Sequence, residues 1–554
     1  AAAGENDGRI LLDVVLHSRD EMEQVITMFT GKGAIAQGTY NRTLRISIAS
    51  QLAAPEMLAS DPRIQAIYQH LPPVLHNDET RRLIGIDAGE PPAAAFPETG
   101  KDEVVAMADS GIDEHHPDLS KRIAGKAAWG RDNDTSDPDG HGTHVAGTIA
   151  GDGSESAGKI KGMAPGAKLF VQSLLNKNGE LADLEMNSFY QLLQEAYDHD
   201  ARIINLSWGA LQESYYTVEA EMIDQFMYEN PEVLVVVAAG NEGVNTPGAT
   251  PTDASTPGFV GSFASNKNGL TVGAGVSKRD NSDSESVASF SNRGPCDDYR
   301  IKPDIVAPGT YILSARSAGV PESKYKAPGS NPAYAFKGGT SMAAPVVSGA
   351  AALVREYFRK RKKNQQPSAI LVKATLLNGT RQLSGSGAMQ GTKMIPNNHQ
   401  GFGMLNMLNT IPNSQNNFAL WYADSLETPD LVFTKKDEER FWLLTLKADS
   451  WIRVCMVYRD RAVRSTQADL TLLMALNGTT SKWWGNAGIK SNGEFPDKEE
   501  FDRDNNTEII RLEKANAGQY KIAIKAANIR MDEVGFALVV TTGDTASKLT
   551  TATK

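Results

Sequence analysis

The chain has 554 residues, with 56 Lys and Arg against 67 Asp and Glu, so its formal net charge is −11. That length predicts about three or four domains, and the acidic balance argues against nucleic acid as the main partner, because nucleic-acid binders carry basic surfaces. No apolar run approaches the ~18 residues of a membrane-spanning helix. The two cysteines, Cys296 and Cys455, exclude a disulfide framework and a multi-cysteine metal site, and we expect two free thiols.

Residues 1–76 carry the signals of a first, small α+β domain. Ser18, followed three residues later by Glu21, is a capping box that opens a helix, and a second short helix is expected over 55–60. The predicted strands cover 10–15, 34–39, 43–49 and 64–71. Together these elements give the β-α-β-β-α-β order of a ferredoxin-like fold. A Pro/Ala-rich linker is expected over 89–100.

Residues 77–412 form a second predicted domain, in which apolar runs alternate with helical segments. Strands are expected at 104–108, 169–174, 203–206, 233–239 and 305–307, and helices at 184–197 and 218–228. Continuous apolar strands separated by helices indicate an α/β fold with a parallel sheet that is covered on both faces. In such a fold, ligands bind at the carboxyl ends of the strands.

Residues 413–544 lack helical signals and carry short alternating runs separated by turn residues. These runs cover 441–446, 451–457, 470–475, 508–512, 520–524 and 536–540. Their spacing predicts an all-β sandwich or jelly roll. The Thr/Lys-rich residues 545–554 are expected to be a frayed tail.

Three short motifs carry most of the functional signal. Asp109 ends a predicted strand in Ala-Asp-Ser-Gly, His141 lies in Gly-His-Gly-Thr-His-Val-Ala-Gly, and Ser341 lies in Gly-Gly-Thr-Ser-Met-Ala-Ala-Pro before an apolar helix. A serine becomes a nucleophile when a base removes its proton, and an imidazole base needs a carboxylate to fix its tautomer. Each residue alone has a structural explanation, as a turn cap, a helix-capping histidine or an N-cap serine. Three matched motifs in the order Asp, His, Ser favour a catalytic triad.

With these motifs the sequence resembles the subtilisin-like serine proteases, the subtilases, over residues 104–406. The resemblance implies that Ser341 is the nucleophile, His141 the general base and acid, and Asp109 the orienting carboxylate. It further implies that Asn241, in Ala-Ala-Gly-Asn-Glu-Gly, donates its side-chain amide to the oxyanion together with the Ser341 backbone N–H. Without the triad, Asn241 would be interpreted as a turn residue.

The same resemblance assigns the substrate-binding walls. Ser207, Trp208 and Gly209 match the family's substrate-binding strand, and Asn178 and Gly179 match the opposite wall, where an extended peptide would pair by strand addition. Trp208 equally fits an ordinary core position.

The side-chain pocket is expected beside Gly240. Glu242 is expected near its rim, where a carboxylate favours neutral or basic side chains.

Further motifs resemble the oxidatively stable alkaline protease branch of the family, whose members carry a C-terminal jelly roll and often bind calcium. They are Ser-Asn-Arg-Gly-Pro at 291–295, Arg-Ile-Lys-Pro-Asp at 300–304, Ala-Pro-Gly-Thr at 307–310 and Gln-Gly-Phe-Gly at 400–403. Structural calcium is therefore expected, although Thr471 stands, after Asp469, where relatives have a second Asp. Hard oxygen ligands could come from Asp502, Asp504, Asn505 and Asn506, or these residues could form a polar turn.

The resemblance also implies that residues 1–76 are an inhibitory propeptide of a self-processing zymogen, removed by autocatalytic cleavage between His76 and Asn77. A permanent structural domain is the alternative. Because secreted subtilases carry such a domain, we expect a secreted protein whose signal peptide is absent from this sequence, with an intracellular location left open.

The predicted function is that of a serine endopeptidase acting on protein and peptide substrates, with no nucleic-acid or membrane partner and no cofactor in the chemistry. Two other interpretations remain: an inactive protease retained as a binding protein, which the intact triad disfavours, and a C-terminal glycan- or protein-binding module that carries the protease, with Trp483 and Trp484 as the place to look. The basic run 359–363 is interpreted as a solvated helix end. A metal site at Asp137, Asp139, His141 and His144 is rejected because it lacks the zinc-protease pattern.

Overall fold

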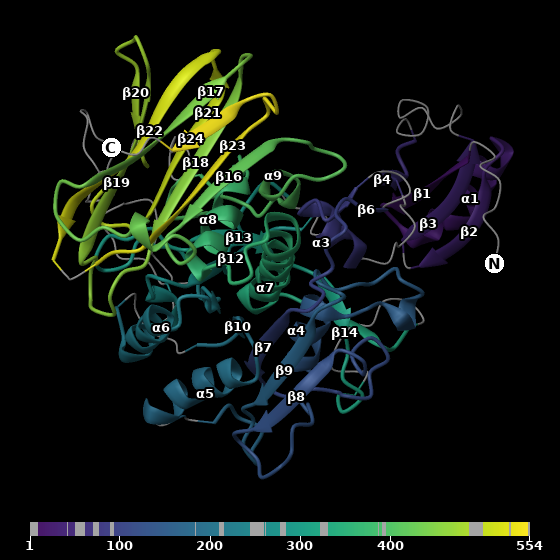
Figure 1. Ribbon diagram of the computed structural model, residues 1–554. Helices are drawn as coiled ribbons and strands as arrows, with labels where there is room; N and C mark the ends of the chain where they lie inside the picture. Colours follow the sequence, from purple (N-terminus) through teal and green to yellow (C-terminus); the bar gives the residue numbers. More distant parts are fainter. Residues whose placement is uncertain are drawn as a thin grey trace. The chain divides into compact units, whose positions relative to one another are not determined.

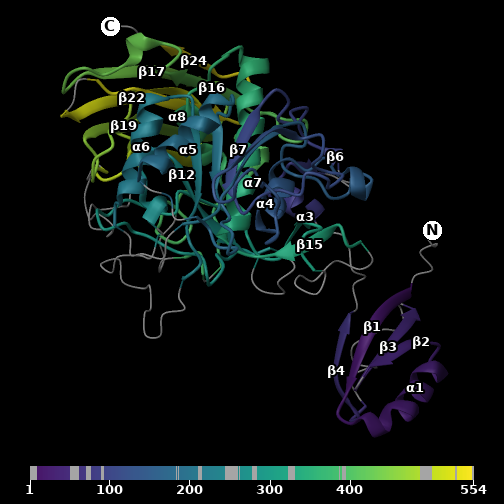
Figure 2. The same cartoon turned by 90° about the horizontal axis from the view of Figure 1, so that it is seen from below.

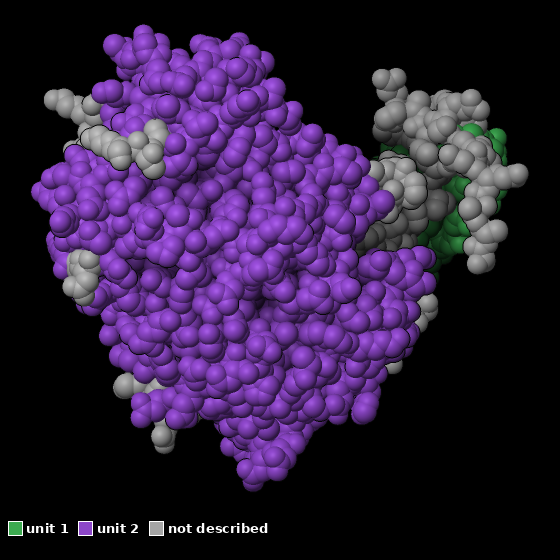
Figure 3. All heavy atoms as spheres, viewed as in Figure 1, with its two compact units in different colours: residues 1–75 green, residues 76–554 purple. Residues whose placement is uncertain are grey.

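The computed structural model of the chain divides into two compact units, Ala1–Leu75 and His76–Lys554, which Figure 3 colours separately. The structure describes residues 9–40, 42–49, 61–69, 77–88, 93–182, 184, 186–209, 215–243, 260, 262–277, 284–321, 331–385, 387–389, 395–486, 502–530 and 533–551. Within this described part, no helix is long and apolar enough to cross a membrane. Both cysteines are buried free thiols, as predicted.

The N-terminal unit is built on an antiparallel sheet with the strand order β2-β3-β1-β4. Its elements are β1 (Arg9–Leu16), α1 (Met22–Gly31), β2 (Ile35–Tyr40), β3 (Thr43–Ala49) and β4 (Ile64–Gln69). Successive side chains of a strand face opposite sides of the sheet, so Val14 and Ile46 point to one side and form a core with Val25 and Phe29 of α1. Ser18 caps a 3₁₀ turn directly before α1. The short helix expected over 55–60 lies outside the described residues.

A seven-stranded, all-parallel sheet forms the centre of the second unit, in the order β13-β12-β11-β10-β7-β9-β8. The strands of this part are β5 (Asp87–Ala88), β6 (Ala93–Ala94), β7 (Val104–Asp109), β8 (Ile123–Ala128), β9 (Lys168–Ser173), β10 (Ile203–Leu206), β11 (Leu234–Ala238), β12 (Leu270–Gly275), β13 (Ile305–Pro308), β14 (Ile312–Ala315) and β15 (Tyr334–Lys337). The predicted parallel α/β fold is therefore confirmed. The linker expected over 89–100 includes β6, which pairs with β5.

Helices cover both faces of this sheet. They are α3 (Asn77–Leu83), α4 (His141–Ala150), α5 (Met186–Asp198), α6 (Val218–Glu229), α7 (Thr340–Tyr357), α8 (Ala369–Gly379) and α9 (Met407–Thr410). The pair α5 and α6 lies on one side of β7 and the pair α4 and α7 on the other (Figure 2). Apolar strand residues such as Val236 and Val237 are consequently buried on both faces.

Two antiparallel sheets follow in the C-terminal part (Figure 1), in the orders β16-β23-β18-β21 and β20-β19-β22-β17-β24. Their strands are β16 (Ala419–Asp424), β17 (Glu439–Leu446), β18 (Ser450–Tyr458), β19 (Ala468–Leu476), β20 (Lys482–Trp484), β21 (Thr507–Ala515), β22 (Gly518–Ile529), β23 (Phe536–Thr542) and β24 (Lys548–Thr551). Val454 and Leu538 point into the core between the sheets, whereas Cys455 and Val539 join the core of the parallel-sheet part.

The prediction of a frayed tail over 545–554 is wrong for residues 548–551, which form β24 and pair with β17. The basic run at the end of α7 is also more engaged than expected. Arg359 pairs with Glu103 and Arg361 with Glu98, so these side chains lie across neighbouring segments instead of only facing water.

Candidate active site

Asp109 and His141 meet at the carboxyl end of the parallel sheet. Asp109 is the last residue of β7, and His141 is the first residue of α4. His141 Nδ1 lies 2.7 Å from Asp109 Oδ1, and the same oxygen accepts a hydrogen bond of 2.7 Å from the Ser110 backbone N–H. The carboxylate is almost fully buried, while 27% of the histidine side chain is exposed. The imidazole is therefore held through Nδ1, and part of its ring is open to solvent.

The first turn of α4 is fixed by Asp137, a buried carboxylate that sequence reasoning considered only as a metal ligand. It accepts hydrogen bonds from the backbone N–H of Gly140 (2.7 Å) and of Thr143 (2.8 Å) and from the hydroxyl of Ser110 (2.8 Å). These N–H groups belong to the start of the helix and lack intrahelical partners. Asp137 thus sets the orientation of the turn that carries His141. The sequence signal for this role is that Asp137 stands four residues before His141, at the predicted start of the helix.

The two neighbouring histidines have opposite electrostatic environments. Burial lowers the pKa of His141, but the negative charge of Asp109 and the hydrogen bond to it raise this pKa by more, so the net pKa lies above 6.5. His144 is fully buried, and its Nε2 lies 3.0 Å from Ile312 O and 3.1 Å from Ala335 O. Burial lowers the pKa of His144 to about 3, which keeps the ring neutral. Because both partners are carbonyl oxygens, Nε2 is the donor.

Ser341 lies in the first turn of α7, where its backbone N–H has no partner within the helix. A buried chain of hydrogen bonds ties this turn to the end of β10. The Ser207 hydroxyl donates to Ser341 O (2.9 Å), the Asn205 amide donates to Ser207 Oγ (2.9 Å), and the Ser348 hydroxyl donates to Asn205 Oδ1 (2.8 Å). Within the described residues, no hydrogen bond joins the Ser341 hydroxyl to the His141 ring. Such contacts are often long in ligand-free enzymes and tighten when substrate binds.

Asn241, just beyond the carboxyl end of β11, has a defined amide orientation. Its Oδ1 accepts hydrogen bonds from the Thr340 backbone N–H (2.8 Å) and hydroxyl (3.0 Å), which leaves the NH₂ group directed away from this contact. Asn292 supports the loop from below, because its Oδ1 accepts from the N–H groups of Glu242 (2.8 Å) and Gly243 (2.7 Å). Thr340 and Asn292 were not assigned these roles from sequence, although Asn292 stands in a recognised motif.

Gly240 is required beside Asn241 for a steric reason. It has φ = 106°, and a Cβ atom at this position would lie 2.2 Å from Asn292 Nδ2 and 2.9 Å from Glu242 Oε2. A larger residue would therefore both strain the backbone and displace the Asn292 support.

Two adjoining cavities flank these residues, and Trp208 lines both. The first has a volume of about 210 Å³ and is lined by Ser341, Thr340, Asn241, Gly240, Glu242, Trp208, Gly209, Ala238, Phe263 and Ala264. The second, of about 240 Å³, is lined by His141, Asp109, Ser110, Asp139, Leu175, Gly179, Leu181, Ser207 and Trp208. The structure therefore brings the expected substrate-wall residues 207–209 and Gly179 to the same place as Ser341 and His141, the expected nucleophile and base.

Trp208 combines the two roles left open by its sequence. Its indole N–H donates to Ala108 O at 3.0 Å, and its ring packs edge-on against Phe263 at 4.9 Å between centroids. It is thus anchored in the core and also forms a wall. On the opposite side, Asn178 lies in an exposed turn where its N–H donates to Asn176 Oδ1 (2.9 Å), and Gly179 adopts φ = 80°.

Of the four residues considered for calcium, Asp502, Asn505 and Asn506 make side-chain hydrogen bonds within the protein. Asp502 accepts hydrogen bonds from the N–H of Asp504 (3.0 Å) and from Asn486 Nδ2 (2.7 Å), and Asn505 Oδ1 accepts from Ile301 N–H (2.9 Å). Asn506 Nδ2 donates to Tyr458 O, whereas Asp469 Oδ1 and Thr471 Oγ1 are buried without a hydrogen bond. Among the described residues, no group of three or more His, Cys, Asp or Glu is arranged to hold a metal ion. Calcium therefore stays a prediction. His76, at the expected cleavage position, lies outside the described residues.

Comparison with known proteins matches residues 100–403 to the subtilase family. The chain is 34% identical over 314 residues to serine protease AprX of Bacillus subtilis (strain 168), covering 54% of this chain and 67% of AprX. It is 34% identical over 298 residues to the major intracellular serine protease of the same organism, covering 52% and 81%. It is 27% identical over 547 residues to the serine protease/ABC transporter B family protein tagA of Dictyostelium discoideum, covering 80% of this chain but only 30% of tagA.

Proposed function

The chain belongs to the subtilase family, and from this premise we propose that it is a serine endopeptidase that hydrolyses proteins through an acyl-enzyme. The observation that carries the proposal is the Asp109–His141 contact of 2.7 Å beside a cavity lined by Ser341 and Asn241. A buried carboxylate on Nδ1 leaves Nε2 as the basic nitrogen, which is the arrangement that activates a serine hydroxyl.

The proposed first step transfers the Ser341 hydroxyl proton to His141 Nε2 while Oγ bonds to the scissile carbonyl carbon. The carbonyl oxygen becomes an oxyanion, which the Ser341 backbone N–H and the Asn241 NH₂ group stabilise. The helix dipole of α7 favours negative charge at the same place. Because Asn241 Oδ1 is already held by Thr340, its NH₂ group needs no reorientation when the charge develops.

In the second step His141 returns its proton to the leaving amine nitrogen, and the C–N bond breaks to leave the acyl group on Ser341. Water then attacks the ester with His141 again as base, and the acid product and the free hydroxyl are released. Asp109 stabilises the imidazolium that forms in each half of the reaction.

For substrate, we propose an extended peptide whose backbone lies between residues 207–209 and the turn at Asn178 and Gly179. The side chain before the scissile bond would enter the cavity of about 210 Å³ beside Gly240. Glu242 lines that cavity, which supports the expectation that neutral or basic side chains are accepted.

The direct test compares wild-type protein with Ser341→Ala. We expect loss of peptide hydrolysis on the order of 10⁶-fold, and a serine-directed phosphonate should label only Ser341 in the wild type. Labelling at another residue, or hydrolysis by the variant at the wild-type rate, would reject the mechanism. An inactive but folded and substrate-binding wild-type protein would instead favour the interpretation as a retired protease.

We further propose that the N-terminal unit is an inhibitory propeptide, cleaved between His76 and Asn77. Support comes from its separation as a compact unit, Ala1–Leu75, with its own core. The wild-type chain should shorten to a species that begins at Asn77, whereas Ser341→Ala should stay intact. If the uncleaved chain is fully active and the added fragment 1–76 does not inhibit it, the unit is a permanent domain. The alkaline-protease branch, a jelly roll and secretion remain proposals from the same resemblance.

A further inference from the structure

One wall of the substrate cavity is made by a short 3₁₀ helix, η4 (Ser262–Ser265), which contributes Phe263 and Ala264. Phe263 packs against Trp208, which also lines the cavity. The residues directly after η4 hold it in place. Asn266 Nδ2 donates to Phe263 O (2.8 Å), and Asn266 Oδ1 accepts from Gly269 N–H (2.9 Å). The position of Phe263 therefore depends on the segment that follows it.

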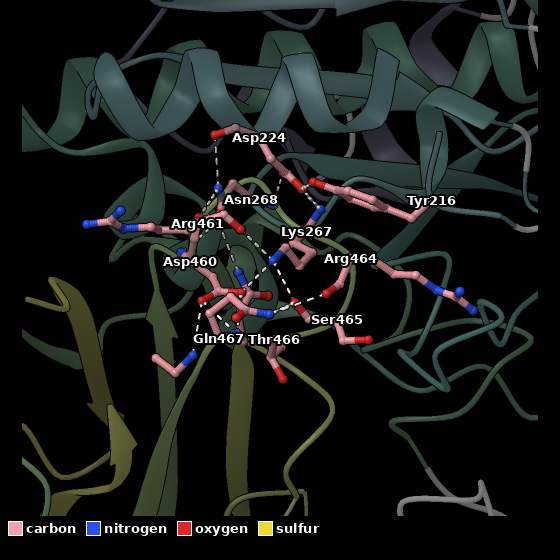
Figure 4. Close-up of polar contacts among 12 residues, drawn as sticks. Tyr216, Asp224, Lys267, Asn268, Asp460, Arg461, Arg464, Ser465, Thr466 and Gln467 are labelled. Atoms are coloured by element: carbon pink, nitrogen blue, oxygen red, sulfur yellow. Dashed lines mark hydrogen bonds and ion pairs between the residues drawn. The ribbon is translucent and has the colours of Figure 1, made fainter. Parts of the chain in front are cut away.

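That segment carries Lys267, whose side chain is fully buried and belongs to the parallel-sheet part of the chain. Its ammonium group donates three hydrogen bonds, and all three acceptors lie on the C-terminal loop that follows β18 (Figure 4). They are Asp460 Oδ2 (2.6 Å), Arg461 O (2.6 Å) and Ser465 O (2.9 Å). All three ammonium protons are thereby satisfied, and the nitrogen is fixed at one point.

Backbone-like contacts reinforce this connection. Asn268 pairs with Asp460 in both directions, because its Oδ1 accepts from Asp460 N–H (3.0 Å) and its Nδ2 donates to Asp460 O (2.8 Å). On the other side, Asp224 of α6 accepts from the N–H groups of Lys267 and Asn268 (2.9 and 2.8 Å) and from the Tyr216 hydroxyl (2.8 Å). Figure 4 shows the segment held between α6 and the C-terminal loop.

We propose that Lys267 and Asp460 are positioning residues for the peptidase, through which the C-terminal loop sets the place of η4 and so the width of the substrate cavity. This inference rests on the proposed function and adds a determinant of side-chain preference. Burying an ammonium ion is costly, and an apolar pair of similar size often gives equal or greater stability. The ammonium group of Lys267 adds three directional hydrogen bonds, which fix the position of its segment relative to the C-terminal loop as well as holding the two together.

The test compares the wild type with Lys267→Met, Asp460→Asn and the double variant. Titration with the phosphonate gives the concentration of active enzyme in each preparation. Peptide anilides that differ only in the residue before the scissile bond, Phe or Ala, report the cavity. We expect KM for the Phe substrate to rise roughly 10-fold to 100-fold while kcat and the Ala substrate change less than about threefold, since only a side chain that reaches η4 senses its displacement. Asp460→Asn, which keeps the side-chain volume, carries the test if Lys267→Met does not fold.

Arg464→Met is the matched control. Arg464 lies on the same loop and pairs with Asp297 at 2.6 Å, also between the parallel-sheet part and the C-terminal part, but its side chain is 63% exposed. In the described part of the chain it makes no hydrogen bond or ion pair with residues 266–269. It should change KM for either substrate by less than about twofold, because exposed ion pairs contribute little. Equal losses on both substrates, or the same effect from Arg464→Met, would overturn the proposal.

Hydrogen exchange separates failure of this inference from failure of the proposed function. In Ser341→Ala protein, which cannot digest itself if the mechanism is right, peptides covering 262–269 should lose protection in Lys267→Met but keep it in Arg464→Met. Unchanged protection would refute the positioning role. If wild-type protein hydrolyses neither anilide, the endopeptidase proposal fails, and the exchange result still decides whether the ion pair positions η4.

Discussion

Replacing Asp109 by Asn is the sharpest test of the charge arrangement at the site. In the wild type, Oδ1 accepts from both His141 Nδ1 and Ser110 N–H, whereas Oδ2 is buried without a hydrogen bond. An asparagine that keeps its oxygen toward His141 puts its two N–H donors where the buried Oδ2 of the wild type has no hydrogen-bond partner. The flipped amide instead points donors at the Ser110 N–H and at Nδ1, and so favours the wrong tautomer of the base.

The expected effect has two measurable parts. The turnover rate should fall on the order of 10⁴-fold, which corresponds to about 5 kcal/mol of transition-state stabilisation. The pH profile should also move. Catalysis needs neutral His141, so wild-type kcat/KM should decline as the pH drops through the raised pKa of His141, above 6.5. With the charge of Asp109 removed, burial remains and lowers this pKa, so the decline should shift below pH 6.5.

Initial rates on a peptide anilide between pH 4.5 and 9 measure both parts. Asp137→Asn is the control, because Asp137 is a buried carboxylate of the same region that contacts the first turn of α4 but not the imidazole. It should lower the melting temperature and leave the acid limb in place. If Asp109→Asn keeps the wild-type acid limb and loses less than about tenfold in rate, the negative charge of Asp109 does not act on His141 as proposed.

Three further outcomes follow from the described geometry. Asn241→Ala should lower kcat by roughly 10²–10³ with little change in KM, measured with active-site-titrated enzyme, because the amide acts only on the developing oxyanion. His144 has a pKa of about 3 in the folded protein against 6.5 in the unfolded chain, so it does not lower the free energy of unfolding above pH 6.5 but lowers it by up to about 5 kcal/mol as the pH falls toward 3. His144→Gln, which can still donate to Ile312 O and Ala335 O, should reduce this pH-dependent loss in melting curves between pH 7 and 4. Met342 is only 1% exposed, so peroxide should leave most activity, and rapid inactivation with sulfoxide at Met342 would contradict this.

Much of the parallel sheet was predictable because its strands are short apolar runs that helices separate. The strands that sequence reasoning did not find lack this signal for identifiable reasons. β8 is an edge strand with half-exposed residues, and it contains Gly125. β12 contains Gly273 and Gly275, which disfavour a strand by local propensity, yet burial on both faces holds it in the sheet. Tertiary context overrode local propensity in both cases.

The site was predictable at the level of its motifs but not of its supports. Asp109, His141 and Ser341 each stand at a strand end or helix start, where local sequence is distinctive. The supports Asp137 and Asn292 are polar residues in turns, and their role depends on which N–H groups the fold brings to them. The contact of Lys267 with Asp460 joins residues 193 positions apart, and no local pattern indicates it.

The packing of the four-stranded C-terminal sheet bears on whether this part could be a separate binding module. Alternate residues of β18 serve two cores: Val454 and Met456 belong to the core between the two sheets, and Cys455 and Val457 belong to the core that includes α8. Released from the rest of the chain, the second face would expose several apolar side chains to water, each at a cost of roughly 1.5–3 kcal/mol. A module that acts alone keeps a polar outer face, and this sheet lacks one over α8. The four-stranded sheet is therefore better understood as part of the fold that supports the parallel-sheet part, which agrees with the proposal that the loop between β18 and β19 positions one wall of the proposed substrate cavity.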